Sequence, residues 1–429
     1  MDFRTSLINH LPQSEVDSLL ESIETGKVTH CLLLNVKKMS DEEFVRRYPN
    51  VVKHPFVEHA YYYDKDEYEF GKSLLYDDGV FSIEDASAMM VVHFLKPEED
   101  DIILDMCAAP GGKSIGASLA MNDNGVIISN DISYPRAKAM SQNVERMGRG
   151  NMIVASNDFI FSHVYFANTF DKIILDAPCS GSAMMRKNAL AKSDWKPEKV
   201  KTNSRKQLEL LDLAYGMLKE GGTLAYSTCS FSYEEDEGVI NTFKNMHPEI
   251  ELINIPDDPS FVRGIDLPEA VRLHPNHFKG EGQFICLFKK PGTLVKTKKE
   301  ILSNERYKTF INQYGLENRS NEMMRNKFYS LSQHFDVSHL NILRYGVKLF
   351  EMRNIYIPDH HLTHFLAPSF SIAISYEDAK AYIHGDTFPL ERPDNFYIVS
   401  YDNQNLGYVK VTQGVAKNHY PKGLRRTLD

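Results

Sequence analysis

The chain has 429 residues, 42% of them hydrophobic and 25% charged, values typical of a globular protein with two or three domains. The first residues show no basic region followed by a long apolar run, which argues against a signal peptide. The longest apolar runs fall far short of the ~20 residues that span a bilayer. We therefore expect a cytoplasmic protein without membrane segments.

The net charge of −9 argues against general nucleic-acid binding, because the neutralisation of phosphates requires Lys and Arg. Basic residues nevertheless cluster along the chain, and a cluster by itself is most often a solvated surface. The densest cluster consists of Arg186, Lys187, Lys192, Lys196, Lys199, Lys201, Arg205 and Lys206. Others lie at residues 289–299 and 417–426.

The five cysteines are widely spread and contain no CxxC pair. An odd number without paired spacing indicates free thiols and argues against a disulfide framework or a structural metal site. For Cys31 and Cys286 we expect the common role of a small buried hydrophobic residue.

Residues 1–80 mix short helices and strands, which indicates a small α+β module. Ser14 and Ser40 each begin a capping-box pattern and are predicted to open a helix. Residues 29–36 and 55–63 have the composition of strands.

From about residue 82 strands alternate with helices, the pattern of a parallel sheet with crossover connections. The predicted strands are 101–105, 125–131, 151–158, 171–177 and 221–229, and the predicted helices are 84–95, 133–147 and 204–218. Residues 250–255 and 282–290 are predicted to complete the sheet as a hairpin-like pair. This is a doubly wound α/β domain, in which ligands bind at the carboxyl ends of the strands. A boundary at 290–299 precedes a third, α+β domain.

The first of these strands leads into a glycine-rich turn, "DMCAAPGGKS", at residues 105–114. Such a turn lets backbone N–H groups approach a ligand at the start of a helix. A P-loop would need glycine where Cys107 stands, and a dinucleotide fingerprint would need its glycines in a different spacing. An ordinary glycine turn is the alternative.

Acidic residues end four consecutive strands, at Asp105, Asp131, Asp158 and Asp176. One such aspartate is usually a helix cap, but four together favour a common ligand crevice, with Asp131 accepting hydrogen bonds from a ribose. Two cysteines follow the last two strands.

Those cysteines are Cys179 and Cys229, and adjacent strands would bring them to the same edge of the crevice. We expect Lys113, Arg186 and Lys187 to lower a thiol pKa there, whereas Cys107 lines the turn.

Three motifs in order, "DMCAAPGGKS", "DAPCSG" followed by "RKN", and "YSTCS" followed by "EEDEGVI", resemble the signatures of the Nop2/Sun family of RNA (cytosine-5) methyltransferases. The similarity covers residues 82–289. The C-terminal region resembles RsmF-type bacterial 16S rRNA methyltransferases, which end in a PUA-like domain. The resemblance implies an α/β fold with a Rossmann-like class I methyltransferase core at 81–290, an RRM-like RNA-binding module at 1–80 and a PUA-like RNA-binding region at 300–429.

The resemblance also implies S-adenosylmethionine as cofactor. The implied cofactor contacts are Cys107, Ala108, Ala109, Pro110, Gly111, Gly112, Lys113, Asp131, Asp158 and Asp176. Asp131 would bind the ribose and Asp158 would lie near the adenine.

The implied catalytic residues are Cys229, Cys179, Asp176 and Lys113. Carbon 5 of cytosine is a poor nucleophile, and addition of a thiolate to carbon 6 activates it. In this family the attacking thiol belongs to the Thr-Cys motif, here Cys229, and the Pro-Cys thiol, here Cys179, assists release. Asp176 would stabilise the adduct at the nitrogen edge of the base, and Lys113 would orient the base or Asp176.

The sequence departs from the family at Ser82, Glu84 and Asp236, where Tyr, Gln and Asn are usual. None of these removes a catalytic group, so they bear on RNA positioning. The basic segment 186–206 is then interpreted as a phosphate-facing surface, with Trp195 either packed inside or stacked on a base.

The resulting hypothesis is a monomeric enzyme that forms 5-methylcytosine in 16S rRNA, acting on the RNA or on the small ribosomal subunit. The alternatives are the same chemistry on tRNA or 23S rRNA, and a ribosome-assembly factor without turnover. A third alternative is a redox protein with Cys179 and Cys229 as a disulfide pair, which leaves the glycine turn unexplained.

Overall fold

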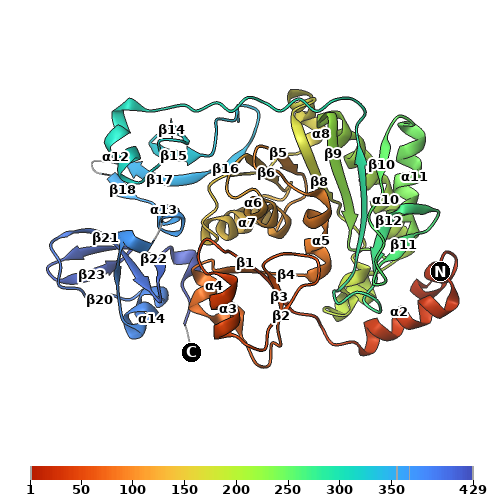
Figure 1. The fold of residues 1–429 in the computed structure, drawn as a ribbon, viewed down its shortest axis with the longest axis horizontal. Helices are drawn as coiled ribbons and strands as arrows, with labels where there is room; N and C mark the ends of the chain where they lie inside the picture. Colours follow the sequence, from red (N-terminus) through yellow and green to blue (C-terminus); the bar gives the residue numbers. More distant parts are fainter. Residues whose placement is uncertain (1, 354–355, 367, 428–429) are drawn as a thin grey trace.

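The computed structural model describes residues 2–353, 356–366 and 368–427. The chain begins with two helices and a small antiparallel sheet of order β2-β3-β1-β4 (Figure 1). The helices are α1 (Phe3–Ile8), α2 (Gln13–Thr25), α3 (Asp41–Arg47) and α4 (Leu74–Asp77). The strands are β1 (Cys31–Leu34), β2 (Val52–Lys53), β3 (Ala60–Tyr62) and β4 (Phe81–Glu84).

One of the two predicted capping boxes is confirmed. The Ser40 side chain accepts a hydrogen bond from the Glu43 N–H at the start of α3. The prediction for Ser14 is wrong, because α2 already begins at Gln13, directly after Pro12. The Glu15 carboxylate is also engaged elsewhere, accepting from His274 and His277 at 2.8 Å each.

The central sheet has the order β11-β12-β13-β9-β8-β5-β6-β7-β16, with β10 paired to β13. Its five inner strands, β9 to β7 in that order, are parallel and confirm the predicted alternation. They are β5 (Ile102–Asp105), β6 (Val126–Asn130), β7 (Met152–Ala155), β8 (Phe170–Asp176) and β9 (Leu218–Thr228). The antiparallel strands are β10 (Glu251–Ile253), β11 (Val262–Gly264), β12 (Leu267–Leu273), β13 (Gln283–Lys289) and β16 (Ile342–Tyr345).

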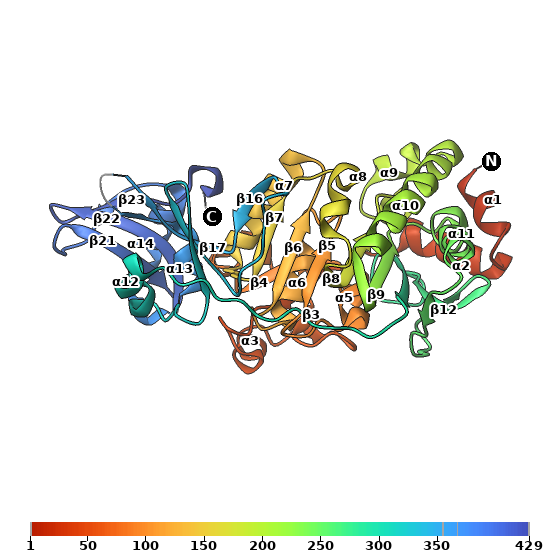
Figure 2. The ribbon, with the colours of Figure 1, turned by 90° about the horizontal axis from the view of Figure 1, so that it is seen from above.

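Helices cover both faces of this sheet, so its strands are buried on two sides and consist of nearly continuous apolar runs. On one face lie α5 (Ala86–Leu95), α6 (Gly112–Ala120) and α7 (Tyr134–Arg146). On the other lie α8 (Phe159–Ser162), α10 (Pro197–Met217) and α11 (Glu237–Met246), with α9 (Ala189–Asp194) just before α10 (Figure 2).

The C-terminal region forms two further sheets at the far end of the molecule from α1 and α2 (Figures 1 and 2). The first contains β14 (Ser320–Met324), β15 (Lys327–Leu331), β17 (Val347–Met352) and β18 (Tyr356–Pro358). The second contains β19 (Ser371–Ala373), β20 (Phe388–Pro389), β21 (Asn395–Tyr401), β22 (Gln404–Thr412) and β23 (Val415–Asn418). The helices are α12 (Lys308–Gln313), α13 (His360–Phe365) and α14 (Tyr376–His384).

Two strands cross the divisions expected from the sequence. β4 extends the N-terminal sheet to Glu84, and β16, from the C-terminal region, pairs antiparallel with β7 at the edge of the central sheet. The division of the chain into domains at residues 80 and 290 therefore stays a prediction. Among the described residues, no helix combines the length and apolar character needed to cross a membrane.

Candidate active site

The predicted site residues gather at the carboxyl edge of the parallel strands. Asp105 is the last residue of β5 and Asp176 the last of β8, while Cys229 directly follows β9. β5 and β8 are neighbours in the sheet. The chain continues from β5 to α6 on one face and from β8 towards α10 on the other. A crevice for ligands forms at such a reversal point in doubly wound sheets.

The turn between β5 and α6 is fixed by its backbone. The Ala108 N–H donates to the Asn130 carbonyl at 2.7 Å, which ties the turn to the end of β6. Gly111 has a φ of +108°, in the left-handed region that favours glycine, and it caps α6. A Cβ on Gly112 would lie 1.9 Å from a carboxylate oxygen of Glu84. The turn therefore favours glycine at 111 for its backbone conformation, whereas a side chain at 112 would have to displace the Glu84 carboxylate.

Asp131 and Asp158 both flank this crevice and both also bind their own backbone. One oxygen of Asp131 accepts from the Ser133 N–H at 2.9 Å, and the other lies 3.2 Å from the Arg136 guanidinium. Asp158 accepts from the Ile160 N–H at 3.0 Å as the cap of α8. The ligand roles of both residues stay predictions.

Asp105 is sealed inside the protein. Burial raises the pKa of its carboxyl to about 7, although the Ser114 hydroxyl donates to it at 2.6 Å. Its other oxygen has no hydrogen-bond partner in the described structure. Through this hydrogen bond Asp105 joins the end of β5 to α6.

Asp176 is held by three donors. The Lys113 ammonium donates to one oxygen at 2.7 Å, and Ser227 and Gln283 donate to the other at 2.7 and 2.8 Å. Burial acts to lower the pKa of Lys113, but the adjacent Asp176 carboxylate raises it overall. The pair therefore presents a fixed negative and a fixed positive group beside the cysteines.

The Sγ atoms of Cys179 and Cys229 lie 3.1 Å apart, as two free thiols. The expected lowering of a thiol pKa is wrong for Cys179. Its contact with Cys229 and its burial raise its pKa well above the usual value. Cys31 and Cys286 are buried in the core, as expected.

Arg186 does not lie on the predicted phosphate-facing surface, and Lys187 is exposed there but forms ion pairs. Arg186 donates to Glu281 at 2.8 Å and to the Gly280 carbonyl at 2.8 Å, and its side chain is 6% exposed. Lys187 lies 3.3 Å from Asp85 and 3.8 Å from Glu281. Arg186 therefore neutralises the buried Glu281 inside the protein, whereas Lys187 is exposed and paired with acids.

Five other cations of the basic segment are exposed and unpaired in the described structure. Lys196, Lys199, Lys201, Arg205 and Lys206 are exposed on or next to α10, and no ion pair involves them among the described residues. Burial raises the pKa of Cys107 to about 12, whereas the charge of Lys206 acts to lower it.

The same segment carries Trp195, the one tryptophan of the chain. Trp195 is buried against Phe3 of α1, with ring centroids 5.2 Å apart. It is therefore a packing residue and does not stack on a base.

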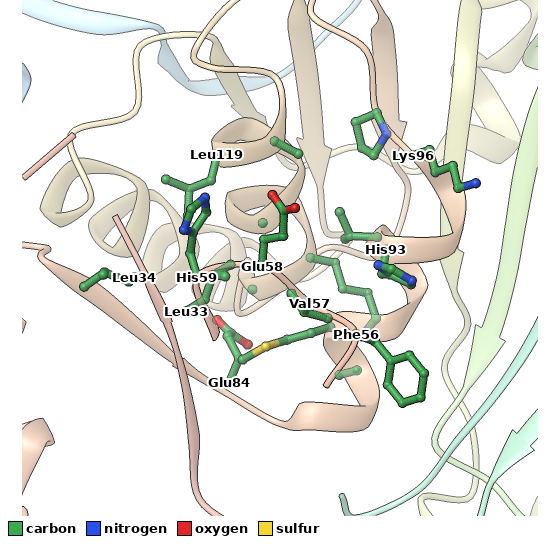
Figure 3. A pocket seen from close by; sticks show the side chains of 18 of the residues that line it. Leu33, Leu34, Phe56, Val57, Glu58, His59, Glu84, His93, Lys96 and Leu119 are labelled. Carbon is green, nitrogen blue, oxygen red and sulfur yellow. The ribbon is translucent and has the colours of Figure 1, made fainter. Parts of the chain in front are cut away.

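A cavity of about 430 Å³ lies behind the glycine turn, between β1, residues 56–59, α5 and α6 (Figure 3). Its walls are mainly apolar, and the side chains of Glu58 and Glu84 lie along it. It reaches Gly112 and Lys113 but not the cysteines. The cavity therefore borders the candidate site without being part of it.

Residues 92–289 match the family described as 16S rRNA methyltransferase RsmB/F, and residues 369–426 match the methyltransferase RsmF PUA domain. The chain belongs to the RsmB/F methyltransferase family. The central sheet is thus its Rossmann-like methyltransferase core, and the sheet of β19 to β23 is its PUA domain.

Curated relatives of the RsmB/F chain extend over most of its length. The ribosomal RNA small subunit methyltransferase F of Citrobacter koseri is 29% identical, over 87% of this chain and 84% of the relative. The protein of the same name from Shewanella piezotolerans is 27% identical, over 99% and 96%. A methyltransferase homologue from Pyrococcus horikoshii has a similar structure, with a TM-score of 0.59 and 26% identity over 67% of this chain and 93% of that one.

The cofactor of this RsmB/F methyltransferase is S-adenosylmethionine, and the crevice has the features that it requires. The turn presents the start of α6 to the crevice, and the Asp131 carboxylate at the end of β6 accepts from the Ser133 N–H and pairs with the exposed Arg136 side chain. Carboxylates at this position accept from ribose hydroxyls in nucleotide-binding sheets.

Sequence reasoning missed two residues of the site, Ser227 and Gln283. Both donate to Asp176, and Gln283 lies at the start of β13, the antiparallel neighbour of β9. The register of that pair, not any motif, brings Gln283 to the aspartate.

Proposed function

We propose that the chain transfers a methyl group to carbon 5 of a cytosine in 16S rRNA, through a covalent adduct with Cys229. The observation that carries this proposal is the pair of sulfurs 3.1 Å apart beside the Lys113–Asp176 pair. A binding protein without turnover has no physical need for two thiols and a fixed ion pair at one edge of a sheet. The names of the curated relatives support the small-subunit RNA as substrate.

In the proposed reaction the Cys229 sulfur forms a bond to ring carbon 6. The electron pair of the C5–C6 double bond then becomes available at carbon 5. S-adenosylmethionine, when bound, supplies the electrophilic methyl group that carbon 5 accepts. Removal of the carbon 5 proton and cleavage of the S–C6 bond restore the double bond and free Cys229.

Asp176 and Lys113 act on the base. Asp176 accepts hydrogen bonds at the nitrogen edge of the cytosine, and Lys113 stabilises the negative charge that develops on the ring during addition. Ser227 and Gln283 keep the carboxylate from turning away, because both bind its other oxygen.

Cys179 assists product release in this scheme. Its raised pKa keeps it protonated at neutral pH, so that it does not compete with Cys229 as a nucleophile. The Cys179 sulfur lies 3.1 Å from the Cys229 sulfur, so the Cys179 thiol can donate a proton to the Cys229 sulfur as it leaves carbon 6.

The exposed cations of α10 are proposed to bind the RNA backbone. A target cytosine must leave its stack to enter the crevice, which costs a few kcal/mol that backbone contacts can offset. These cations are exposed on or next to α10 and are free of ion pairs among the described residues.

Radiolabelled methyl transfer to free 16S rRNA, small subunits, 23S rRNA and tRNA tests the proposal. We expect incorporation into 16S rRNA or small subunits, with 5-methylcytosine as the labelled nucleoside after digestion. Label only in tRNA or 23S rRNA would overturn the substrate, and no label in any RNA would overturn the enzymatic function.

A further inference from the structure

The two cysteine turns share one buried carboxylate. The residue after each cysteine is a serine, and both serines bind Glu235. The Ser180 N–H donates to Oε1 at 2.8 Å, and the Ser180 hydroxyl donates to Oε2 at 2.5 Å. The Ser230 hydroxyl donates to the same Oε2 at 2.6 Å. Glu235 therefore contacts the neighbour of each sulfur directly.

Helix α10 adds two donors to the same carboxylate. The Asn203 amide donates to Oε1 at 3.0 Å and the Gln207 amide at 3.4 Å. Gln207 also donates to the Pro178 carbonyl at 2.9 Å, directly before Cys179. The carboxylate thus links both turns to the helix that carries the exposed cations.

Glu235 has no accessible surface, and within the described part of the chain no Lys or Arg forms an ion pair with it. A buried carboxylate is costly unless hydrogen bonds compensate it, and here several neutral donors do so. An apolar residue would fill this position at lower cost if only packing mattered.

The same turn also holds the residue before Cys229. The Thr228 hydroxyl donates to Asp236 at 2.5 Å, and Asp236 lies 3.2 Å from the Arg272 guanidinium. The two turns are further joined by the Ala183 N–H, which donates to the Cys229 carbonyl at 3.0 Å. The Ser180 and Ser230 hydroxyls also lie 3.2 Å apart, and Glu235 accepts from both of them.

We propose that Glu235 is a positioning residue that sets the distance between the Cys179 and Cys229 sulfurs by holding Ser180 and Ser230 together. The inference rests on the proposed function, because the distance between the sulfurs matters only if both thiols act in the same reaction. Loss of the carboxylate lets the turns move apart, which slows adduct formation and resolution without changing the surfaces that bind cofactor or RNA.

The test compares Glu235→Gln with Glu234→Gln, which removes an exposed acid from the same turn. A displacement of about 1 Å in a catalytic group costs up to ~10²-fold in rate, so we expect single-turnover methyl transfer to fall about 10- to 100-fold in Glu235→Gln. Cofactor Kd and the RNA concentration at half-saturation should stay within about twofold, and Glu234→Gln should match the wild type.

Two further measurements separate positioning from a general structural role. RNA containing 5-fluorocytidine traps the adduct, because carbon 5 then carries a fluorine in place of the proton that must be removed before release. Trapping should slow in parallel with methyl transfer. Alkylation of Cys179, followed by mass spectrometry against pH, should shift to lower pH in Glu235→Gln, since the Glu235 charge is among the groups that raise the Cys179 pKa.

If Glu235→Gln does not fold, Ser180→Ala combined with Ser230→Ala removes the two hydroxyl hydrogen bonds to Glu235 and leaves the acid and its bond from the Ser180 N–H. We expect this variant to slow trapping with unchanged cofactor binding. Wild-type rates in the folded variants, or slower transfer without a shift in the alkylation profile of Glu235→Gln, would overturn the inference. Absence of transfer by the wild-type protein would instead overturn the proposed function.

Discussion

Cys179 and Cys229 share one location but not one environment. The raised pKa of Cys179 arises from its contact with Cys229, its burial and nearby negative charges. The sequence placed both thiols at the edge of the crevice, because each follows a predicted strand. The raised pKa of Cys179 was not predictable, since it depends on the contact with Cys229, on burial and on the charges of Glu235 and Asp176.

Replacement of each cysteine should give a different result. Cys229→Ala should abolish both methyl transfer and covalent RNA adducts, because it removes the nucleophile. Cys179→Ala should allow addition but delay release, and an adduct stable to denaturing electrophoresis should accumulate. Both are measured with labelled RNA on denaturing gels. The opposite pattern would exchange the two roles.

The stability of the protein should depend on the protonation of Asp105. Its folded pKa of about 7 lies above its usual 3.8, so the folded state binds the extra proton and the free energy of unfolding falls as pH rises from about 4 to about 7. Asp105→Asn removes this dependence. The variant should therefore gain stability relative to the wild type between pH about 5 and about 7.5, measured by urea denaturation.

Ser114→Ala gives the matching comparison, because the Ser114 hydroxyl acts to lower the Asp105 pKa. Its loss should extend the pH-dependent fall to higher pH. An equal difference between Asp105→Asn and the wild type at every pH would contradict the assignment.

Helix α10 is the element through which the basic segment acts. The sequence indicated the basic cluster but not which of its residues are paired with acids. The partners Glu281 and Asp85 lie about a hundred residues away in the chain. Five exposed cations of the segment form no ion pair among the described residues, and only the structure separates them from the paired Arg186, Lys187 and Lys192.

Neutralising three of these cations should weaken RNA binding in a salt-dependent manner. Each lost phosphate contact reduces the slope of log affinity against log salt by about 0.7 to 0.9, so Lys201→Ala, Arg205→Ala and Lys206→Ala together should reduce it by about 2 to 3. Fluorescence anisotropy with labelled rRNA at several salt concentrations measures this slope.

Lys298→Ala with Lys299→Ala is the control. These exposed lysines follow Lys296, which pairs with Asp101 at the amino end of β5, the opposite edge of the sheet. The control should leave the slope unchanged. Equal effects of both variants would show that the α10 surface has no special role.

The elements of the central sheet were predictable where a local sequence pattern specifies them. The five parallel strands have continuous apolar runs, and the pairing of β10 with β13 was expected. Residues 55–63, expected as one strand, form a strand only at Ala60–Tyr62, because the His54 ring accepts from the Phe56 and Val57 N–H groups and makes a turn.

At the scale of the molecule, the C-terminal region is attached to the core through β16. This strand pairs with β7 but is only four residues long and distant in sequence, so no local pattern indicates it. Arg344 of β16 donates to Ser141 at 3.0 Å and to Glu145, both on α7, and lies 2.6 Å from the His361 ring of α13.

Arg344→Ala should therefore destabilise the whole protein. It leaves the mostly buried Glu145 without its cation, and loss of one partner of a buried pair costs about 3 kcal/mol. Arg353→Ala, which breaks the more exposed pair with Glu351, should cost less than about 1 kcal/mol. Urea denaturation measures both, and equal costs would show that Arg344 does not join the two regions.

The position of β16 also has a consequence for the order in which the protein is made. A chain is synthesised from its N-terminus, and domains generally fold as they emerge from the ribosome. Here the site residues are all translated before Ile342, yet β7 keeps an unpaired edge until that residue has appeared. A nascent chain therefore carries all of the proposed catalytic side chains on an incomplete sheet, and the sheet is completed only after Ile342 and the rest of β16 have been made.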